Sequence, residues 1–135
     1  MNIISVRDNE SRREFIEFLN TLEGWKTRIK NLHWAAPRKN IHVYLDELLD
    51  IVSEYEDTLA ETFMGILGKM GPLEIKGFYI DCDNAWDLID SAIDDTEEFY
   101  NRIPEHVFYK GILSETETFI HNLQKYRYLF SLCED

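Results

Sequence analysis

One long run of apolar residues at helical spacing does most to limit how this chain can fold. Between Ile41 and Ile66 an apolar side chain recurs every three or four residues, the spacing that places side chains on one face of an α-helix. The stripe consists of Ile41, Leu45, Leu48, Val52, Tyr55, Leu59, Phe63 and Ile66, and it fades near the Gly71-Pro72 pair. A helix of this length must bury its apolar face against other helices.

The segment before this stripe carries the same helical pattern. A first helix is predicted from about residue 11 to about residue 34, after a short strand or tail over residues 1–8. Ser11 and Glu14 have the spacing of a capping box, in which two side chains satisfy backbone amides of a helix's first turn. Pro37 disfavours helical geometry at the residue before it, so we expect the break between the first two helices within residues 35–40.

Two more helices are predicted after the stripe. A third begins near Asp83 or Asn84, either of which is a good N-cap residue. A short helix is expected around residues 104–110, and a fourth long helix from about residue 115, behind a capping-box pair formed by Ser114 and Glu117. Four amphipathic helices predict an all-α four-helix bundle, which is ferritin-like if the connector over residues 71–83 crosses the length of the bundle.

Composition indicates a single folded domain over residues 1–135 and limits its partners. The chain is 44% hydrophobic, and its 14 basic and 26 acidic residues give a net charge of −12. Such a charge repels phosphate backbones, so DNA and RNA binding are disfavoured. No stretch approaches the ~18 apolar residues of a membrane span, and the first residues do not form a signal peptide. We therefore expect a soluble, cytoplasmic protein in which Cys82 and Cys133 are free thiols.

Four potential metal ligands share one face of the predicted second helix. Their intervals are four, eleven and four residues, and they are His42, Asp46, Asp57 and Glu61. At 100° per residue they lie between about 80° and about 180° from Val52, away from the apolar stripe. Val43 and Met64 lie on this same face, and such a mixture of acids and apolar residues favours contact with a protein partner.

Distance limits how these ligands could meet. His42 and Asp57 lie fifteen residues apart, or about 22 Å along a helix that rises 1.5 Å per residue. They cannot bind one ion within one straight helix, because metal–ligand bonds are only about 2.0–2.6 Å long. Two copies that cross antiparallel about a two-fold axis near residues 49–50 would bring His42 and Asp46 of one chain beside Asp57 and Glu61 of the other, twice.

The chemistry of these ligands indicates which metals they would bind. Mixed imidazole and carboxylate ligands suit Fe(II), with Zn and Mn as alternatives. His33, at the end of the first predicted helix, could reach the His42 end of the site across the short loop. The sequence therefore predicts a metal site that is divided between two copies of the chain.

The segment over residues 31–61 resembles the core of the Dps-type miniferritins, which are dodecameric cages of the ferritin-like superfamily. The family motif has a His-Trp pair, a loop, and then a His followed by acids four, fifteen and nineteen residues later. In this chain the motif reads His33-Trp34, His42, Asp46, Asp57 and Glu61, and residues 57–61 (DTLAE) match the family's D-x-x-A-E pattern. The interval between the two His is shorter than is usual in the family, and the lysine-rich tail that many members use to bind DNA is absent.

This resemblance implies an iron-storage protein with ferroxidase activity. Fe(II) would be oxidised by hydrogen peroxide or dioxygen at sites between subunits, and the ferric product would be held inside a dodecameric homo-oligomer, which protects against oxidative damage. The resemblance implies that the ligands are His33, His42 and Asp46 from one subunit and Asp57 and Glu61 from its neighbour. Trp34 would lie beside the iron.

Other interpretations of the same residues stay open. The acids can form a solvated helix face, His42 can be a surface histidine, and Trp34 is more often a core residue. The competing hypothesis is a non-enzymatic acidic helical bundle, a binding or assembly module that keeps the fold without iron chemistry. A bundle that holds a structural Zn is a third. No Glu-x-x-His pair occurs, so an intrachain di-iron site is poorly supported.

Overall fold

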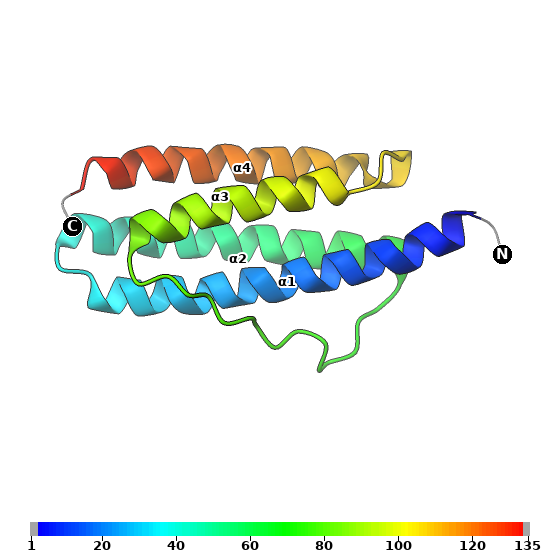
Figure 1. The fold of residues 1–135 in the computed structure, drawn as a ribbon, viewed down its shortest axis with the longest axis horizontal. Helices are drawn as coiled ribbons and strands as arrows, with labels where there is room; N and C mark the ends of the chain where they lie inside the picture. The colour runs from blue at the N-terminus through cyan, green and yellow to red at the C-terminus, as the bar shows by residue number, and fades with distance from the viewer. Residues whose placement is uncertain (1–2, 134–135) are drawn as a thin grey trace.

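The protein is a bundle of four long helices (Figure 1). The computed structural model describes residues 3–133, with side chains from residue 9 onward. The helices are α1 (Ile3–Ala35), α2 (Lys39–Leu67), α3 (Ala85–Arg102) and α4 (Lys110–Ser131), with a short 3-10 helix, η1 (Val107–Tyr109), before α4. No strand occurs in residues 3–133. The predicted all-α fold with four helices is confirmed.

The helices form two antiparallel hairpins that are joined by one long crossover. Helix α1 pairs with α2, and α3 pairs with α4. Helices α2 and α3 run in the same direction, so the connector over residues 68–84 has to return along the whole bundle, and it does so beside α1 (Figure 1). The predicted connector over residues 71–83 is thus found in place, but it is longer at both ends.

The core is built from the apolar stripes that the sequence shows. The stripe of α2 is buried from Ile41 to Phe63, and its last predicted member, Ile66, is half-buried. Aromatic rings fill the centre of the bundle, where Tyr55 of α2 stacks on Phe119 of α4 with ring centroids 4.0 Å apart. The buried polar residues of the described chain are Ser11, Asn20, Thr96 and Thr116.

Asn20 holds the crossover against α1. Its side-chain amide donates to the carbonyl of Glu74 at 3.1 Å, and its side-chain oxygen accepts from the amides of Lys76 and Gly77 at 2.8 and 3.0 Å. The backbone carbonyl of Asn20 accepts from the amide of Phe78 at 2.9 Å. A connector without secondary structure must satisfy its backbone groups elsewhere, and one buried amide side chain does so for three of them.

Gly24 lets the crossover approach α1 closely. A Cβ atom at this position would lie 2.1 Å from the carbonyl oxygen of Phe78, a separation that no real Cβ can adopt. Further along, the guanidinium of Arg28 donates to the carbonyl of Ile80 at 3.0 Å and lies over the ring of Tyr79. The missing side chain at Gly24 is therefore what allows the backbone of residues 77–80 to lie on the helix.

The first helix begins earlier than predicted. Residues 1–8 were expected to form a strand or tail, but α1 already begins at Ile3; residues 1 and 2 lie outside the described part of the chain. Ser11 is buried within α1 and caps nothing. No Pro or Gly occurs in residues 3–10 to stop a helix, and the capping-box spacing is also the spacing of two neighbours inside a helix.

The start of the fourth helix was also placed too late. Helix α4 begins at Lys110, so Ser114 and Glu117 lie inside it. Tyr109 and Ile112 are buried, so the apolar stripe extends toward the N-terminus past Gly111. The short helix expected around residues 104–110 is a single 3-10 turn over Val107–Tyr109.

The other helix ends agree more closely with the prediction. Helix α2 ends at Leu67, because Gly68 adopts a positive φ of 96° and donates its amide to the carbonyl of Met64. Asn84 is the N-cap of α3, and its side chain accepts from the amide of Asp87 at 2.8 Å. The prediction that Asp83 or Asn84 begins this helix is confirmed.

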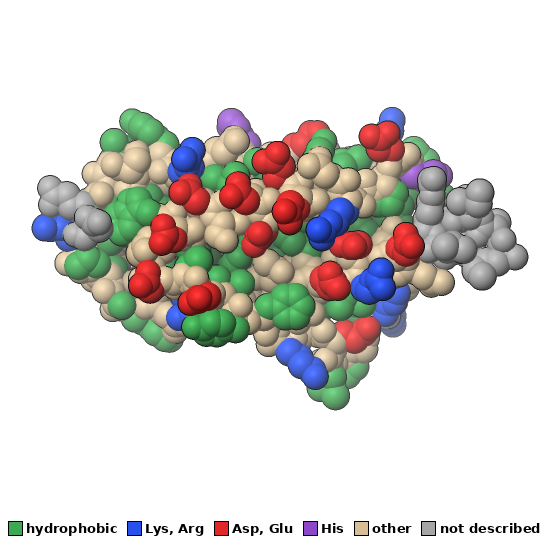
Figure 2. All heavy atoms as spheres, viewed as in Figure 1, with side chains coloured by type: hydrophobic (Ala, Val, Ile, Leu, Met, Phe, Trp, Pro, Cys, Tyr) green, Lys and Arg blue, Asp and Glu red, His purple; other side chains and the backbone are tan. Residues whose placement is uncertain are grey.

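The surface carries the charge that the composition indicates. Acidic side chains are spread along the face of the bundle seen in Figure 2, with fewer basic ones among them. On α3, Asp90 pairs with Arg127 of α4 at 2.7 Å, while Asp94 and Glu97 are exposed.

None of the described helices has the length and apolar character that crossing a membrane requires. Cys82 and Cys133 are free thiols.

Candidate metal centre

The tight turn between α1 and α2 brings His33 and His42 together. Helix α1 ends at Ala35 and α2 begins at Lys39, so only three residues, including Pro37, separate them. The two imidazole rings stack with centroids 3.7 Å apart and planes inclined by 19°. The nine-residue interval, although shorter than is usual for the motif, is therefore sufficient to place the two imidazoles side by side.

Each of these histidines is hydrogen-bonded to the backbone of the other. The Nδ1 atom of His33 lies 2.7 Å from the carbonyl oxygen of His42, and the Nδ1 atom of His42 lies 2.7 Å from the carbonyl oxygen of His33. A carbonyl oxygen can only accept, so each Nδ1 carries the hydrogen and donates it. The pair of bonds closes the turn and fixes the orientation of both rings.

This arrangement determines which ring nitrogen is available to a ligand. In a neutral imidazole that is protonated at Nδ1, the Nε2 atom has a free lone pair. A metal-bound histidine typically donates its other ring N–H to a backbone carbonyl or a carboxylate, which fixes both the tautomer and the ring orientation. His33 and His42 thus have the tautomer and the backbone support of metal-ligating histidines.

The three predicted acidic ligands lie on α2 with open side chains. Asp46 is one turn after His42, and Asp57 and Glu61 are one turn apart toward the other end of the helix. All three are exposed, and none makes a hydrogen bond or ion pair within residues 9–133. Their carboxylates are therefore free to bind a cation or to face another molecule.

The structure does not bring the two ends of this face together within one chain. Helix α2 is continuous from Lys39 to Leu67, so His42 and Asp57 remain about 22 Å apart at 1.5 Å per residue. In the described part of the chain, no group of three or more His, Cys, Asp and Glu side chains is arranged to hold a metal ion. One chain alone therefore presents two separate pieces of the predicted site.

Apolar side chains are exposed around these pieces. Trp34 is 69% exposed beside His33, so its interpretation as a core residue is wrong. Val43, next to His42, is 41% exposed, while Leu49 and Met64 on the same side of α2 are half-buried. An outer helix face that mixes acids with exposed apolar groups is suited to contact with another protein surface.

The interior of the bundle offers no alternative metal site. The buried polar side chains of the described chain are hydroxyls and one amide, with no carboxylate or imidazole among them. Glu117 and His121 lie four residues apart on α4, but Glu117 accepts a hydrogen bond from the hydroxyl of Tyr100 at 2.6 Å and His121 is exposed. The candidate ligands are therefore confined to the outer face of the α1–α2 hairpin.

One acidic group on α2 was missed by sequence reasoning. The side chain of Glu56 is only 13% exposed, and its Oε1 atom accepts from the Lys26 ammonium of α1 at 2.9 Å, while Lys26 also contacts Glu23. Its Oε2 atom is buried without a partner. Burial, reinforced by the nearby Glu23, raises the pKa of Glu56 to about 7. The sequence feature that could have indicated its burial is its position one helical turn after Val52, at the edge of the apolar stripe.

No protein-family model, curated protein or solved structure matches this chain. Its chemistry must therefore be inferred from its own residues and their geometry.

Proposed function

We propose that this protein is a Dps-like miniferritin that binds Fe(II) at sites shared between two chains and oxidises it. The ligands are His33, His42 and Asp46 of one chain, with Asp57 and Glu61 of the other. The ferric product is stored inside a hollow homo-oligomer, and removing Fe(II) together with peroxide protects against oxidative damage.

The observation that carries this proposal is the paired arrangement of His33 and His42. Both rings are held by a backbone carbonyl at Nδ1, so both Nε2 lone pairs are available. Histidines that were only solvated surface residues would not need a backbone hydrogen bond to fix their rings, yet both histidines of this turn have one. Asp46 follows His42 by one helical turn and adds a carboxylate at the same end of α2.

The topology is the second support. Two hairpins joined by one long crossover are the connectivity of ferritin-like bundles. The crossover over residues 68–84 leaves the outer face of α2 with its acids uncovered, because it runs beside α1 (Figure 1). That face is thus open to the same face of a second chain, as an antiparallel two-fold contact requires.

The chemistry follows from the ligand types. Neutral imidazoles retain Fe(II), while carboxylates favour the Fe(III) product because they offset its higher charge. One hydrogen peroxide takes one electron from each of two Fe(II) ions and, with two protons, yields two Fe(III) and two water molecules. With dioxygen as the oxidant, one dioxygen, four Fe(II) and four protons give four Fe(III) and two water molecules. The net charge of −12 favours the approach of cations.

An anaerobic Fe(II) titration followed by addition of peroxide tests the proposal. We expect saturable Fe(II) binding and rapid formation of Fe(III) absorbance in the parent protein. Asp57→Ala combined with Glu61→Ala should slow oxidation by at least about tenfold, since it removes two of the five ligands of each site. The matched control is Asp94→Ala with Glu98→Ala, which removes the same two charges at the same spacing from α3. Equal rates in the parent and the Asp57/Glu61 variant would refute the site.

The competing hypothesis, an acidic binding or assembly module without iron chemistry, differs in its assembly. A cage elutes from a size-exclusion column near twelve subunits, and a simple adaptor elutes as a monomer or dimer. Elution as a monomer would remove the shared site altogether, because a single chain presents its ligands about 22 Å apart at 1.5 Å per residue. A structural Zn site would bind Zn without any oxidation of Fe(II).

A further inference from the structure

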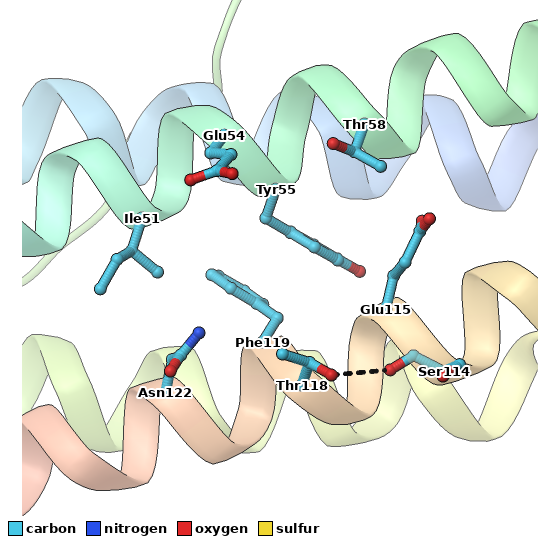
Figure 3. A pocket seen from close by; sticks show the side chains of 9 residues that line it. All are labelled: Ile51, Glu54, Tyr55, Thr58, Ser114, Glu115, Thr118, Phe119 and Asn122. Atoms are coloured by element: carbon cyan, nitrogen blue, oxygen red, sulfur yellow. Dashed lines mark hydrogen bonds between the residues drawn. The ribbon is translucent and has the colours of Figure 1, made fainter.

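A second potential binding site lies where α2 packs against α4, in a groove between the two helices. Figure 3 shows its lining side chains, which come from both helices and enclose about 280 Å³. None of the predicted iron ligands takes part in it. The lining residues are Ile51, Glu54, Tyr55, Thr58, Ser114, Glu115, Thr118, Phe119 and Asn122, without a Lys or Arg among them.

The floor of this groove is formed by the edges of two stacked aromatic rings (Figure 3). Tyr55 and Phe119 stack face to face with centroids 4.0 Å apart and planes inclined by 3°. The Tyr55 hydroxyl is engaged with the hydroxyl of Thr116 at 2.7 Å, and burial raises the pKa of Tyr55, so the phenol stays neutral. The middle of the groove is therefore apolar and rigid.

The two ends of the groove each carry a carboxylate. Glu54 of α2 and Glu115 of α4 lie on opposite sides of the ring pair (Figure 3). The Oε2 atom of Glu115 is buried and has no hydrogen-bond partner in the structure. This oxygen is therefore an acceptor that no donor occupies, and a cation that enters the groove could bind it.

The spacing of these acids follows from helix geometry. Tyr55 and Phe119 lie at the same level, Glu54 is one residue before Tyr55, and Glu115 is four residues before Phe119 on an antiparallel helix. The two acids are thus separated along the bundle by about 7.5 Å, or five residues at 1.5 Å each. Because the two side chains lie on opposite sides of the ring pair (Figure 3), each can bind one of two linked cationic groups.

We propose that the α2–α4 groove binds a linear aliphatic diamine, a site distinct from the iron site. One ammonium group donates to Glu115 and the other to Glu54, and the methylene chain lies along the edges of the stacked Tyr55 and Phe119 rings. An extended chain of four or five carbons has a length comparable to the offset of the two residues along the bundle. The hydroxyls of Thr58 and Thr118 and the amide of Asn122 supply further acceptors at the rim.

Isothermal titration with 1,5-diaminopentane at low ionic strength tests this site. We expect saturable binding of one diamine per chain, and about tenfold weaker binding for pentylamine, which carries only one ammonium group. Glu115→Gln and Glu54→Gln should each weaken diamine binding by about tenfold, since Gln keeps the shape of the side chain but removes the charge. Two-dimensional NMR of the parent protein should show the largest shifts at Thr58 and Thr118.

The matched control is Glu97→Gln, which removes one charge from the exposed face of α3. This variant should bind the diamine as the parent does. The site is overturned if Glu97→Gln weakens binding as much as Glu115→Gln, because attraction would then be a property of the whole acidic surface. It is equally overturned if pentylamine binds as tightly as the diamine, or if binding does not saturate. Because the iron ligands are untouched in these variants, ferroxidase activity is a separate readout.

Discussion

The turn between α1 and α2 and the crossover between α2 and α3 can be compared directly, since both connect to α2. The turn has three residues between its helices, and it is closed by His33 and His42, each bonded to the backbone of the other. The crossover has seventeen residues, 68–84, and it is held by groups of α1 that lie more than fifty residues away in sequence.

The difference shows where this fold can place chemistry. At the crossover, the side chain of Asn20 is fully used in hydrogen bonds to backbone groups, three in the connector and one at the carbonyl of Ile16 in α1. In the turn, the bonds to the backbone use only one nitrogen of each imidazole and leave the other available. The short connection therefore leaves one ring nitrogen of each histidine open to a ligand, as the proposed iron site requires, whereas the long one uses all the polar atoms of the Asn20 side chain.

The largest expected effect comes from removing the anchor of the crossover. Asn20→Ala deletes four hydrogen bonds and takes from the backbone groups of Glu74, Lys76 and Gly77 their partner on α1. The free energy of unfolding should fall by about 3 kcal/mol, as measured by urea denaturation. Thr21→Ala is the control, because its hydroxyl donates only to Glu17 within α1, and it should cost less than about 0.5 kcal/mol. Similar losses in both variants would contradict the anchoring role.

A somewhat smaller effect is expected where the crossover touches α1. Gly24→Ala would place a Cβ atom 2.1 Å from the Phe78 carbonyl oxygen, so the connector has to move, and we expect a loss of about 2 kcal/mol. Gly65→Ala is the control of opposite sign. It lies inside α2 with open space around it, so Ala should stabilise the helix by up to about 1 kcal/mol. Thermal unfolding of both variants measures the difference, and a stabilised Gly24→Ala would show that the contact is not close.

Changing a histidine of the α1–α2 turn should lower the free energy of unfolding less than the crossover variants do, but it should weaken iron binding more. His33→Ala removes one of the two ring-to-backbone bonds and should cost about 1 kcal/mol of folding free energy. The affinity for Fe(II) should fall by about tenfold or more, because one ligand is lost. His121→Ala, an exposed histidine of α4, is the control for both measurements. Unchanged Fe(II) affinity in His33→Ala would remove this residue from the proposed site.

The smallest effect concerns Lys26 and Glu56, which join α1 and α2 between the two connections. Burial raises the pKa of Glu56 to about 7, so the folded protein binds a proton more tightly there than the unfolded chain does. The stabilisation that protonated Glu56 gives the folded protein is fully present at acidic pH, and it is lost as pH rises from about 4.5 to about 7. Glu56→Gln should flatten the dependence of stability on pH in this window, by less than about 1 kcal/mol in total. An unchanged pH profile would show that Glu56 titrates normally.

Periodic features of the sequence predicted the fold well, and local signals predicted its boundaries poorly. The stripe from Ile41 to Phe63 identified α2 because burial of an apolar face dominates helix packing. The capping-box spacing at Ser11 and Ser114 was misleading, since the same spacing occurs inside helices and no Pro or Gly stopped α1 on its N-terminal side. The path of the crossover along α1 depends on Asn20, whose role as an anchor has no signature in sequence.

The candidate sites were predictable to different degrees. The face that carries His42, Asp46, Asp57 and Glu61 follows from helical phase alone. The stacking of His33 on His42 depends on how tightly the chain turns at Pro37, which spacing does not determine. The α2–α4 groove could not be predicted, because it depends on the register between two helices about sixty residues apart, which is set by Tyr55 and Phe119.

Because Trp34 is exposed beside His33, its fluorescence can report whether an ion or another molecule is bound at the turn. The chain has three tryptophans, of which Trp25 is buried and Trp86 is half-buried with its indole N–H bonded to the carbonyl of Phe130. Trp34 alone is largely in water, so its emission lies at the red edge of the spectrum and is the part sensitive to quenching from solvent. Arrival of a paramagnetic ion at His33, or of a second chain on this face, would alter that red component while Trp25 serves as the internal reference.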